Sequence, residues 1–201
     1  MLIMRYFTLK TRLLALSLLA AICAAAQPTP AEFAAHPERS AGIYRSYEYL
    51  PGPAAPVPAG YEPFYISHYG RHGSRYHSSE KAYDRPLSVL LQASEAGKLT
   101  PKGQEVLAKV EALAADAYLR YGDLSPRGTA EHRGIAERMY AAWPEVFSTD
   151  GGRVCRVESR STLVPRCILS MAAFNERLKE LNPEIRMTRE SSQRYIPYMS
   201  N

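Results

Sequence analysis

One short stretch constrains this chain more than any other, because an extended run leads directly into a turn rich in glycine and charge. Tyr61–Tyr69 mixes aromatic and apolar residues and predicts a strand, and Gly70 and Gly73 punctuate the turn that follows it. Glycine lets the backbone adopt otherwise forbidden angles and approach a ligand closely. A strand, a glycine-flanked loop and then a helix is how α/β proteins present a ligand at the carboxyl ends of their strands.

The charged residues of this turn suit a phosphate group. Arg71 and Arg75 offer planar sets of donors that pair with phosphate oxygens and do not lose their charge. His72 lies beside Arg71, and a neutral imidazole is a nucleophile near neutral pH. The sequence therefore predicts a phosphate site, and a basic surface turn on an ordinary domain is the alternative that spacing alone leaves open.

Residues 1–26 predict a secretory signal peptide, in which three basic residues precede the apolar run Leu13–Ile22 and the small residues Ala24–Ala26. The apolar run is too short to span a bilayer comfortably, so no stable membrane span is expected. A lipid anchor at Cys23 is disfavoured, because Ile22 is larger than the small residue that normally precedes a lipidated cysteine. We therefore expect an exported protein, either periplasmic or secreted.

The basic charge of the chain does not indicate a nucleic-acid partner. The predicted leader holds three basic residues and no acidic ones, so the formal net charge falls from +5 for the whole chain to +2 for residues 27–201. No tract rich in lysine and arginine supports nucleic-acid binding, and none is expected.

Two cysteines follow the leader, Cys155 and Cys167. In an exported protein they could form one disulfide, and the sequence leaves that question open because geometry decides it. Two scattered cysteines give no ligand spacing for zinc, so no metal site is expected.

The rest of the chain divides into a proline- and alanine-rich extension, residues 27–59, and one domain, residues 60–201. The extension is expected to be extended rather than a domain of its own. Helices are expected over Leu87–Glu95, from Thr100-Pro101 to Tyr121-Gly122, from Ser125-Pro126 to Pro144 and over Pro165–Leu181, and further strands over Arg153–Glu158 and Ile185–Thr188. Strands that alternate with helices predict an α/β layered domain with a mainly parallel sheet flanked by helices.

A second strand-loop-helix unit is expected to supply a further arginine. A polar loop, residues 159–164, follows the strand at Arg153–Glu158, and Arg166 stands at the start of the next helix. Because two such strand ends can lie side by side in a parallel sheet, we expect Arg166 near Arg71, His72 and Arg75. A helix amino terminus adds backbone donors and a favourable dipole for an anion.

With these residues in view, the sequence resembles the histidine acid phosphatases, branch two of the histidine phosphatase superfamily. Arg71-His72-Gly73-Ser74-Arg75 matches the family's Arg-His-Gly-x-Arg motif, and Leu124-Ser125-Pro126-Arg127-Gly128 is similar to its Leu-Thr-x-x-Gly helix start. The block from Ser161 to Phe174, with Arg166-Cys167 and Ala172-Ala173-Phe174, is most similar to the multiple inositol polyphosphate phosphatases, a group that includes phytases. The resemblance runs from about Tyr61 to the last residue.

The resemblance implies a phosphomonoester hydrolase that works through a phosphohistidine, with inositol polyphosphates of the phytate type as substrates. His72 would attack phosphorus, while Arg71, Arg75 and Arg166 would bind the phosphate oxygens and stabilise the transferring group. Gly73 would let the loop turn under the phosphate. The implied partner is a phosphorylated small molecule, with no metal and no organic cofactor; the oligomeric state stays open.

The chain departs from the family pattern in two places. His77 stands where the family usually has a proline, which affects the rigidity of the loop. More seriously, no histidine follows His132, so the family's C-terminal His-Ala-Glu or His-Asp motif, which supplies a second phosphate ligand and the general acid, is missing. We therefore interpret residues 60–201 as the N-terminal part of the domain, incomplete at its C-terminus.

This departure keeps alternatives open. The first is a truncated, catalytically impaired or inactive fragment that binds phosphate, because a leaving group without a proton donor slows catalysis by roughly 10²–10⁴-fold. A mutase of the superfamily's first branch is a weaker alternative, since the predicted leader and Arg166-Cys167 argue against it.

Other residues near these motifs are expected to have structural roles. His68 and His132 are expected to pack in the interior, and Glu131 is expected to cap a helix or pair at the surface, whereas His77 could contact substrate.

Overall fold

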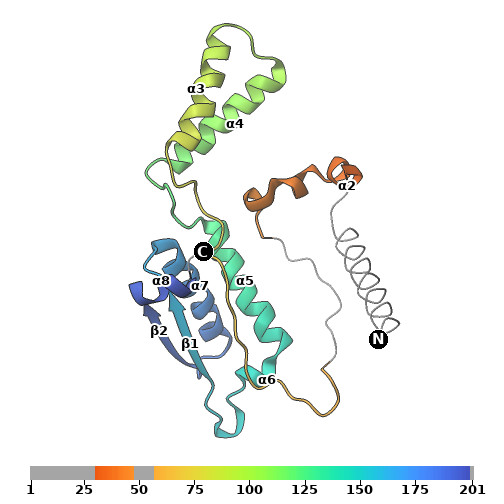
Figure 1. Ribbon diagram of the computed structural model, residues 1–201, viewed down its shortest axis with the longest axis vertical. Helices are drawn as coiled ribbons and strands as arrows, with labels where there is room; N and C mark the ends of the chain where they lie inside the picture. The colour runs from red at the N-terminus through yellow and green to blue at the C-terminus, as the bar shows by residue number, and fades with distance from the viewer. Residues whose placement is uncertain (1–29, 48–56, 200–201) are drawn as a thin grey trace, which may run out of the picture. The chain divides into compact units, whose positions relative to one another are not determined.

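The computed structural model describes residues 30–47 and 57–199, and the chain divides into two units, Met1–Ser46 and Tyr47–Asn201. The predicted signal peptide and Cys23 lie outside the described residues. In the first unit, α2 (Pro30–Ala35) is followed by the 3₁₀ helix η1 (Pro37–Tyr44), each with a proline in its first turn (Figure 1). The expectation of an extended chain here is therefore wrong for these residues, because proline is well suited to the first turn of a helix.

The second unit contains a parallel pair of strands packed with helices (Figure 1). Its elements are α3 (Lys81–Glu95), α4 (Pro101–Ala117), α5 (Pro126–Ala142), α6 (Pro144–Phe147), η2 (Asp150–Gly152), β1 (Arg156–Ser161), α7 (Pro165–Leu181), β2 (Arg186–Ser191), η3 (Gln193–Tyr195) and α8 (Ile196–Met199). Strands β1 and β2 pair in register from Arg156 opposite Arg186 to Ser161 opposite Ser191, with α7 as the crossover between them. The predicted α/β class is confirmed.

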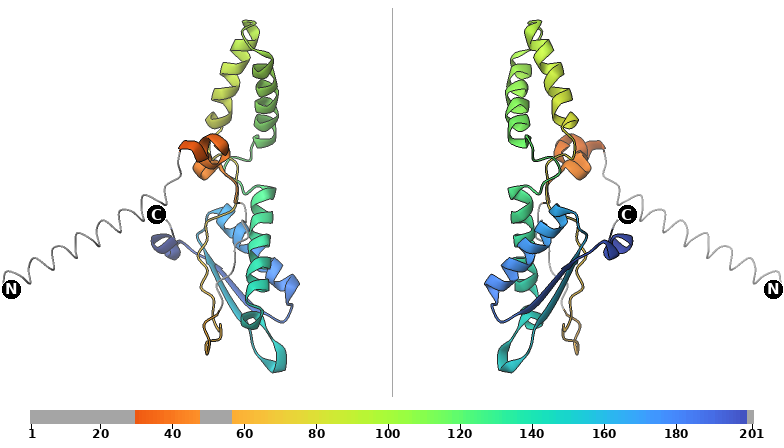
Figure 2. Two further views of the ribbon diagram at one scale, coloured as in Figure 1. Left: turned by 90° about the vertical axis from the view of Figure 1, so that its right-hand side faces the viewer. Right: turned by 90° about the vertical axis from the view of Figure 1, so that its left-hand side faces the viewer.

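Helices α5 and α7 pack side by side, and α7 also packs on β1 (Figure 2). The core that they enclose contains Ala136, Phe147, Cys155, Leu178 and Ile185. Leu178 on α7 and Ile185 just before β2 are fully buried, so these side chains join the helix pair to the sheet. Cys155 belongs to this core as a free thiol, and Cys167 is also free, so the structure contains no disulfide between them.

Two of the predicted helix starts are confirmed in detail. The Thr100 hydroxyl accepts a hydrogen bond from the Gly103 N–H at the start of α4, at 3.1 Å. The Ser125 hydroxyl accepts one from the Gly128 N–H at the start of α5, at 3.2 Å. In each case the cap is followed directly by a proline, which needs no hydrogen bond for its nitrogen.

The predicted strand Tyr61–Tyr69 is wrong as a strand. These residues run without helical or strand structure, and no described strand pairs with them; β1 pairs only with β2 among the described residues (Figure 1). Ile66 packs against the core, but Phe64 is 87% exposed, so the run has neither a ladder of hydrogen bonds nor a buried face to make it a strand.

Several other boundaries differ from expectation. Helix α3 begins at Lys81 rather than Leu87 and includes Pro86, a residue that normally discourages a helix interior. Strand β1 begins at Arg156 and ends at Ser161, so part of the predicted polar loop is strand. Strand β1 continues to Ser161 because that residue pairs with Ser191 of β2.

The core predicts a large cost for shortening Leu178. Leu178→Ala should lower the free energy of unfolding by about 2–5 kcal/mol, because it leaves a cavity between α7 and the sheet. Leu113→Ala on α4, where the side chain is 60% exposed, is the matched control and should change it much less. Urea unfolding followed by circular dichroism measures both, and equal losses in the two variants would contradict this core.

Candidate active site

The turn around His72 is fixed by side chains from the two packed helices. His132 on α5 hydrogen-bonds through Nε2 to the carbonyl oxygen of Arg71 at 3.1 Å. Because a carbonyl only accepts, the His132 Nε2 carries the proton and donates. Ser170 on α7 accepts a hydrogen bond from the Gly73 N–H at 3.1 Å. The residues on either side of His72 are therefore held from different helices.

Ser74 is held more tightly still. Its N–H and its hydroxyl both donate to the carboxylate of Glu131 on α5, each at 2.7 Å. Its carbonyl accepts from both the N–H and the hydroxyl of Ser125, at 2.9 and 2.8 Å. The N–H groups of Gly73 and Ser74 thus point to protein acceptors, so an anion at this turn would be bound by side chains rather than by these two backbone donors.

The chain after the turn pairs with the segment that leads into α5. Arg75 and Leu124 form an isolated antiparallel bridge, and the Tyr76 N–H donates to the Asp123 carbonyl at 3.0 Å. These bonds bring the turn to the start of α5. They explain why two motifs about fifty residues apart in the sequence form one structure.

Close backbone contact makes two glycines necessary. A Cβ on Gly73 would lie 2.4 Å from the carbonyl oxygen of Gly128, and a Cβ on Gly128 would lie 2.2 Å from the carbonyl oxygen of Ser74. Neither backbone atom can move aside as a flexible side chain would. Gly73, which the sequence singled out for loop formation, is therefore required because the turn lies directly against α5.

The neutral ring of His72 carries its proton on Nδ1. Its Nδ1 lies 2.9 Å from the carbonyl oxygen of Gly73, so Nδ1 is the protonated nitrogen and Nε2 keeps its lone pair in the neutral ring. Burial lowers the pKa of His72, the hydrogen bond to Gly73 partly opposes this, and the positive charges of Arg166, Arg71 and Arg75 lower the pKa further. The neutral form consequently persists to more acidic pH than in an ordinary histidine.

The three arginines that the sequence predicted are all near enough to act on His72 electrostatically. Arg75 donates through Nη1 to the carbonyl of Tyr76 at 2.8 Å. The Nε of Arg166 is buried, and it has no hydrogen-bond partner in the described part of the chain.

The other predicted residues take supporting or separate positions. His68 is exposed, so the expectation that it packs in the interior is wrong. Its ring stacks on Phe174 with centroids 5.5 Å apart, and partial burial lowers its pKa. The His77 ring contacts Tyr83 edge to face, with centroids also 5.5 Å apart, and the His77 backbone N–H donates to the Tyr83 hydroxyl. His132 is buried, as expected, and burial is the main cause that lowers its pKa.

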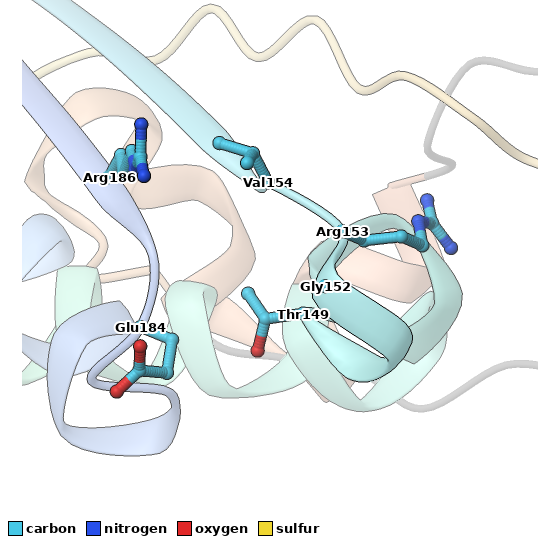
Figure 3. Close-up of a pocket in the computed structure, with 6 residues that line it drawn as sticks. All are labelled: Thr149, Gly152, Arg153, Val154, Glu184 and Arg186. Carbon is cyan, nitrogen blue, oxygen red and sulfur yellow. The ribbon is translucent and has the colours of Figure 1, made fainter.

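A cavity of about 230 Å³ lies elsewhere, at the amino ends of the two strands (Figure 3). Its lining residues are Thr149, Gly152, Arg153, Val154, Glu184 and Arg186. They precede or begin β1 and β2, whereas the His72 turn contacts the start of α5 and the middle of α7. This cavity is therefore separate from the candidate site.

Within residues 30–47 and 57–199, no group of three or more histidine, cysteine, aspartate or glutamate side chains is arranged to hold a metal ion. The helices in these ranges also include none with the length and apolar character needed to cross a membrane.

Sequence reasoning missed how Glu131, Ser125 and Ser170 serve the site. Glu131 was expected to cap a helix or pair at the surface, yet its side chain is only 8% exposed and binds Ser74. Ser125 caps α5 as predicted, and it also holds the carbonyl of Ser74. The sequence places Ser125 and Glu131 at the start of one helix and Ser170 on another, but the partner of each depends on the tertiary contact with the turn.

Neither a protein-family model nor a curated protein significantly matches this chain. Among solved structures, it is similar to the crystal structure of Bifidobacterium longum multiple inositol polyphosphate phosphatase in complex with inositol hexasulfate. The TM-score is 0.50 and the sequence identity 24%, over 69% of this chain and 30% of that one. The similarity shows that this chain shares the α/β fold of part of that phosphatase, and the chain spans less than a third of the neighbour's length.

The contact between the turn and α5 predicts opposite effects for two glycines of that helix. Gly128→Ala should lower the free energy of unfolding by about 1–3 kcal/mol, because the new Cβ has no room beside Ser74. Gly134→Ala is the matched control: its Cβ would meet only the flexible end of Arg138, so it should stabilise α5 by up to about 1 kcal/mol. Thermal or urea unfolding measures both, and a neutral Gly128→Ala would contradict the close contact.

The charges around His72 predict a measurable titration. Proton NMR of the imidazole should give His72 a pKa below the ordinary histidine value, and Arg166→Gln should raise it, because one of the charges that lower it is removed. Arg133→Gln, at a residue paired with Glu180, is the charge-matched control. A His72 pKa that responds equally to both substitutions would show that Arg166 is not specifically placed at the turn.

Proposed function

We propose that this chain belongs to an exported phosphomonoester hydrolase that transfers a phosphoryl group to His72. The observation that carries the proposal is the state of His72: its Nδ1 proton is held by the Gly73 carbonyl, which leaves Nε2 available, and three arginine charges act on the same ring. An imidazole nucleophile beside several guanidinium groups suits a phosphate dianion better than a neutral substrate.

In the proposed reaction, the lone pair of the His72 Nε2 forms a bond to phosphorus while the bond from phosphorus to the leaving oxygen breaks. The leaving oxygen takes that electron pair and then a proton from solvent water. Arg71, Arg75 and Arg166 bind the non-bridging oxygens and offset the charge of the transferring group. Water then attacks phosphorus, the bond to nitrogen breaks, and phosphate is released.

The proposed substrates are inositol polyphosphates of the phytate type. Two observations support this class: the fold is similar to that of a phosphatase solved with inositol hexasulfate, and Arg166-Cys167 and the residues after it resemble the multiple inositol polyphosphate phosphatases. A ligand with several dianionic groups also suits a site in which arginine side chains, rather than backbone donors, would bind the anion.

A second candidate is phosphate binding without efficient turnover of alcohol esters. It is favoured by the position of Glu131, because this carboxylate accepts two hydrogen bonds from Ser74 and is therefore used to hold the turn rather than to protonate a leaving group. An alkoxide that leaves without a proton donor slows the first step by roughly 10²–10⁴-fold.

The test uses two substrates that differ in their need for a proton. With a dinitrophenyl phosphate, whose leaving group needs no proton, the protein should form an acid-labile phosphohistidine at residue 72, detected by mass spectrometry after alkaline quenching. His72→Ala should abolish the adduct, whereas His36→Ala, at an exposed residue of the first unit, should not. Absence of any adduct in the unsubstituted protein would overturn the proposed function.

Phytate distinguishes the two candidates. Release of phosphate from phytate at a rate comparable to that from the activated ester supports the hydrolase. Release from the activated ester alone, with phytate bound but intact, supports the phosphate-binding alternative.

A further inference from the structure

Glu131 is the least exposed carboxylate among the ion pairs of the described residues, and its contacts explain how its oxygens are satisfied there. The side chain is 8% exposed, whereas its i,i+4 partner Arg127 is 60% exposed and lies 3.7 Å away, at the edge of ion-pair distance. Its two short hydrogen bonds go to Ser74 instead. Burying a carboxylate is costly unless its oxygens are well satisfied, so the contact with Ser74 is what stabilises Glu131 in place.

Ser74 stands between the proposed nucleophile and one of its arginines. It follows Gly73, whose carbonyl accepts from the His72 ring, and it precedes Arg75, whose backbone is paired with Leu124. A change in the orientation of Ser74 would therefore move His72 and Arg75 relative to each other. Glu131 binds both the backbone N–H and the hydroxyl of Ser74, so it restrains the backbone and the side chain at this position.

We propose that Glu131 is a positioning residue, which acts through Ser74 to hold His72 and Arg75 in the relative geometry that a phosphate group requires. The proposal rests on the proposed phosphate chemistry of the turn. It gives Glu131 no role as a proton donor. How far its side-chain oxygens extend from α5 matters more for this role than its negative charge.

Three substitutions separate reach from charge. Glu131→Gln removes the charge but keeps an oxygen for the Ser74 N–H and an amide that the Ser74 hydroxyl can accept from. Glu131→Asp keeps the charge but withdraws the carboxylate by one methylene. Glu131→Met fills the same space without any acceptor and leaves the Ser74 N–H unpaired, which is the costliest outcome for a buried donor.

The readout is the affinity for inorganic phosphate, measured by calorimetry on the full chain. Glu131→Gln should bind within about threefold of the unsubstituted protein, whereas Glu131→Asp and Glu131→Met should bind about tenfold or more weakly, as expected for losing hydrogen bonds to a charged acceptor. Glu137→Met is the matched control, because Glu137 lies on the same helix and pairs with Arg177 instead; it should leave the affinity unchanged.

A double substitution tests the route through Ser74. Ser74→Ala alone removes one of the two donors, so it should weaken binding by a few fold. Added to Glu131→Met it should cause little further loss, because the interaction that it removes is already absent. Additive losses would show that Glu131 acts by another route and would overturn the proposal.

The outcomes also separate this proposal from the proposed function. Phosphate binding without a phosphohistidine overturns the proposed reaction. The positioning role is then decided by the relative phosphate affinities of the Glu131 variants. An Asp variant as tight as the unsubstituted protein, or a Gln variant as weak as Met, overturns the positioning role. If Glu131→Met does not fold, the Asp and Gln variants still give this decision. An unsubstituted protein that binds no phosphate overturns both.

Discussion

The contact between the His72 turn and helix α5 is the constraint on which the site depends. Gly73 and Gly128 bring two stretches of backbone so close that neither position has room for a Cβ. At that distance Ser125, Glu131 and His132 reach the carbonyl and N–H groups of the turn directly. The turn is thus held by a helix that packs in the core through Ala136 and against α7.

This arrangement also determines how the turn can meet an anion. In many phosphate sites the backbone N–H groups of a glycine-rich loop bind the oxygens directly. Here the N–H groups of Gly73 and Ser74 are used to hold the turn against α7 and α5. In the proposed function, the side chains of Arg71, Arg75 and Arg166 would therefore bind the ligand. Burial first, and then the charges of these three arginines, lower the pKa of His72.

Much of this could be predicted from the sequence, because the signals were local. The proline-capped helix starts at Thr100 and Ser125 follow from side-chain chemistry within four residues, and both are confirmed. Arg166 was predicted near His72 from two adjacent strand ends. Arg166 does lie close enough to lower the pKa of His72, but the strand expected before His72 is absent from the described residues. The strand at Tyr61–Tyr69 was wrong, since a strand depends on a partner that no local pattern contains. The role of Glu131 was missed for the same reason: its bonds to Ser74 exist only after the turn packs on α5.

The most direct test of this account is a crystal structure of the protein with orthovanadate, which imitates a phosphoryl group under attack. The account predicts vanadium bonded to Nε2 of His72, with its oxygens bound by Arg71, Arg75 and Arg166 and with the bonds from Ser74 to Glu131 intact. Vanadate bonded through Nδ1, or found only in the cavity lined by Arg153 and Arg186, would contradict it.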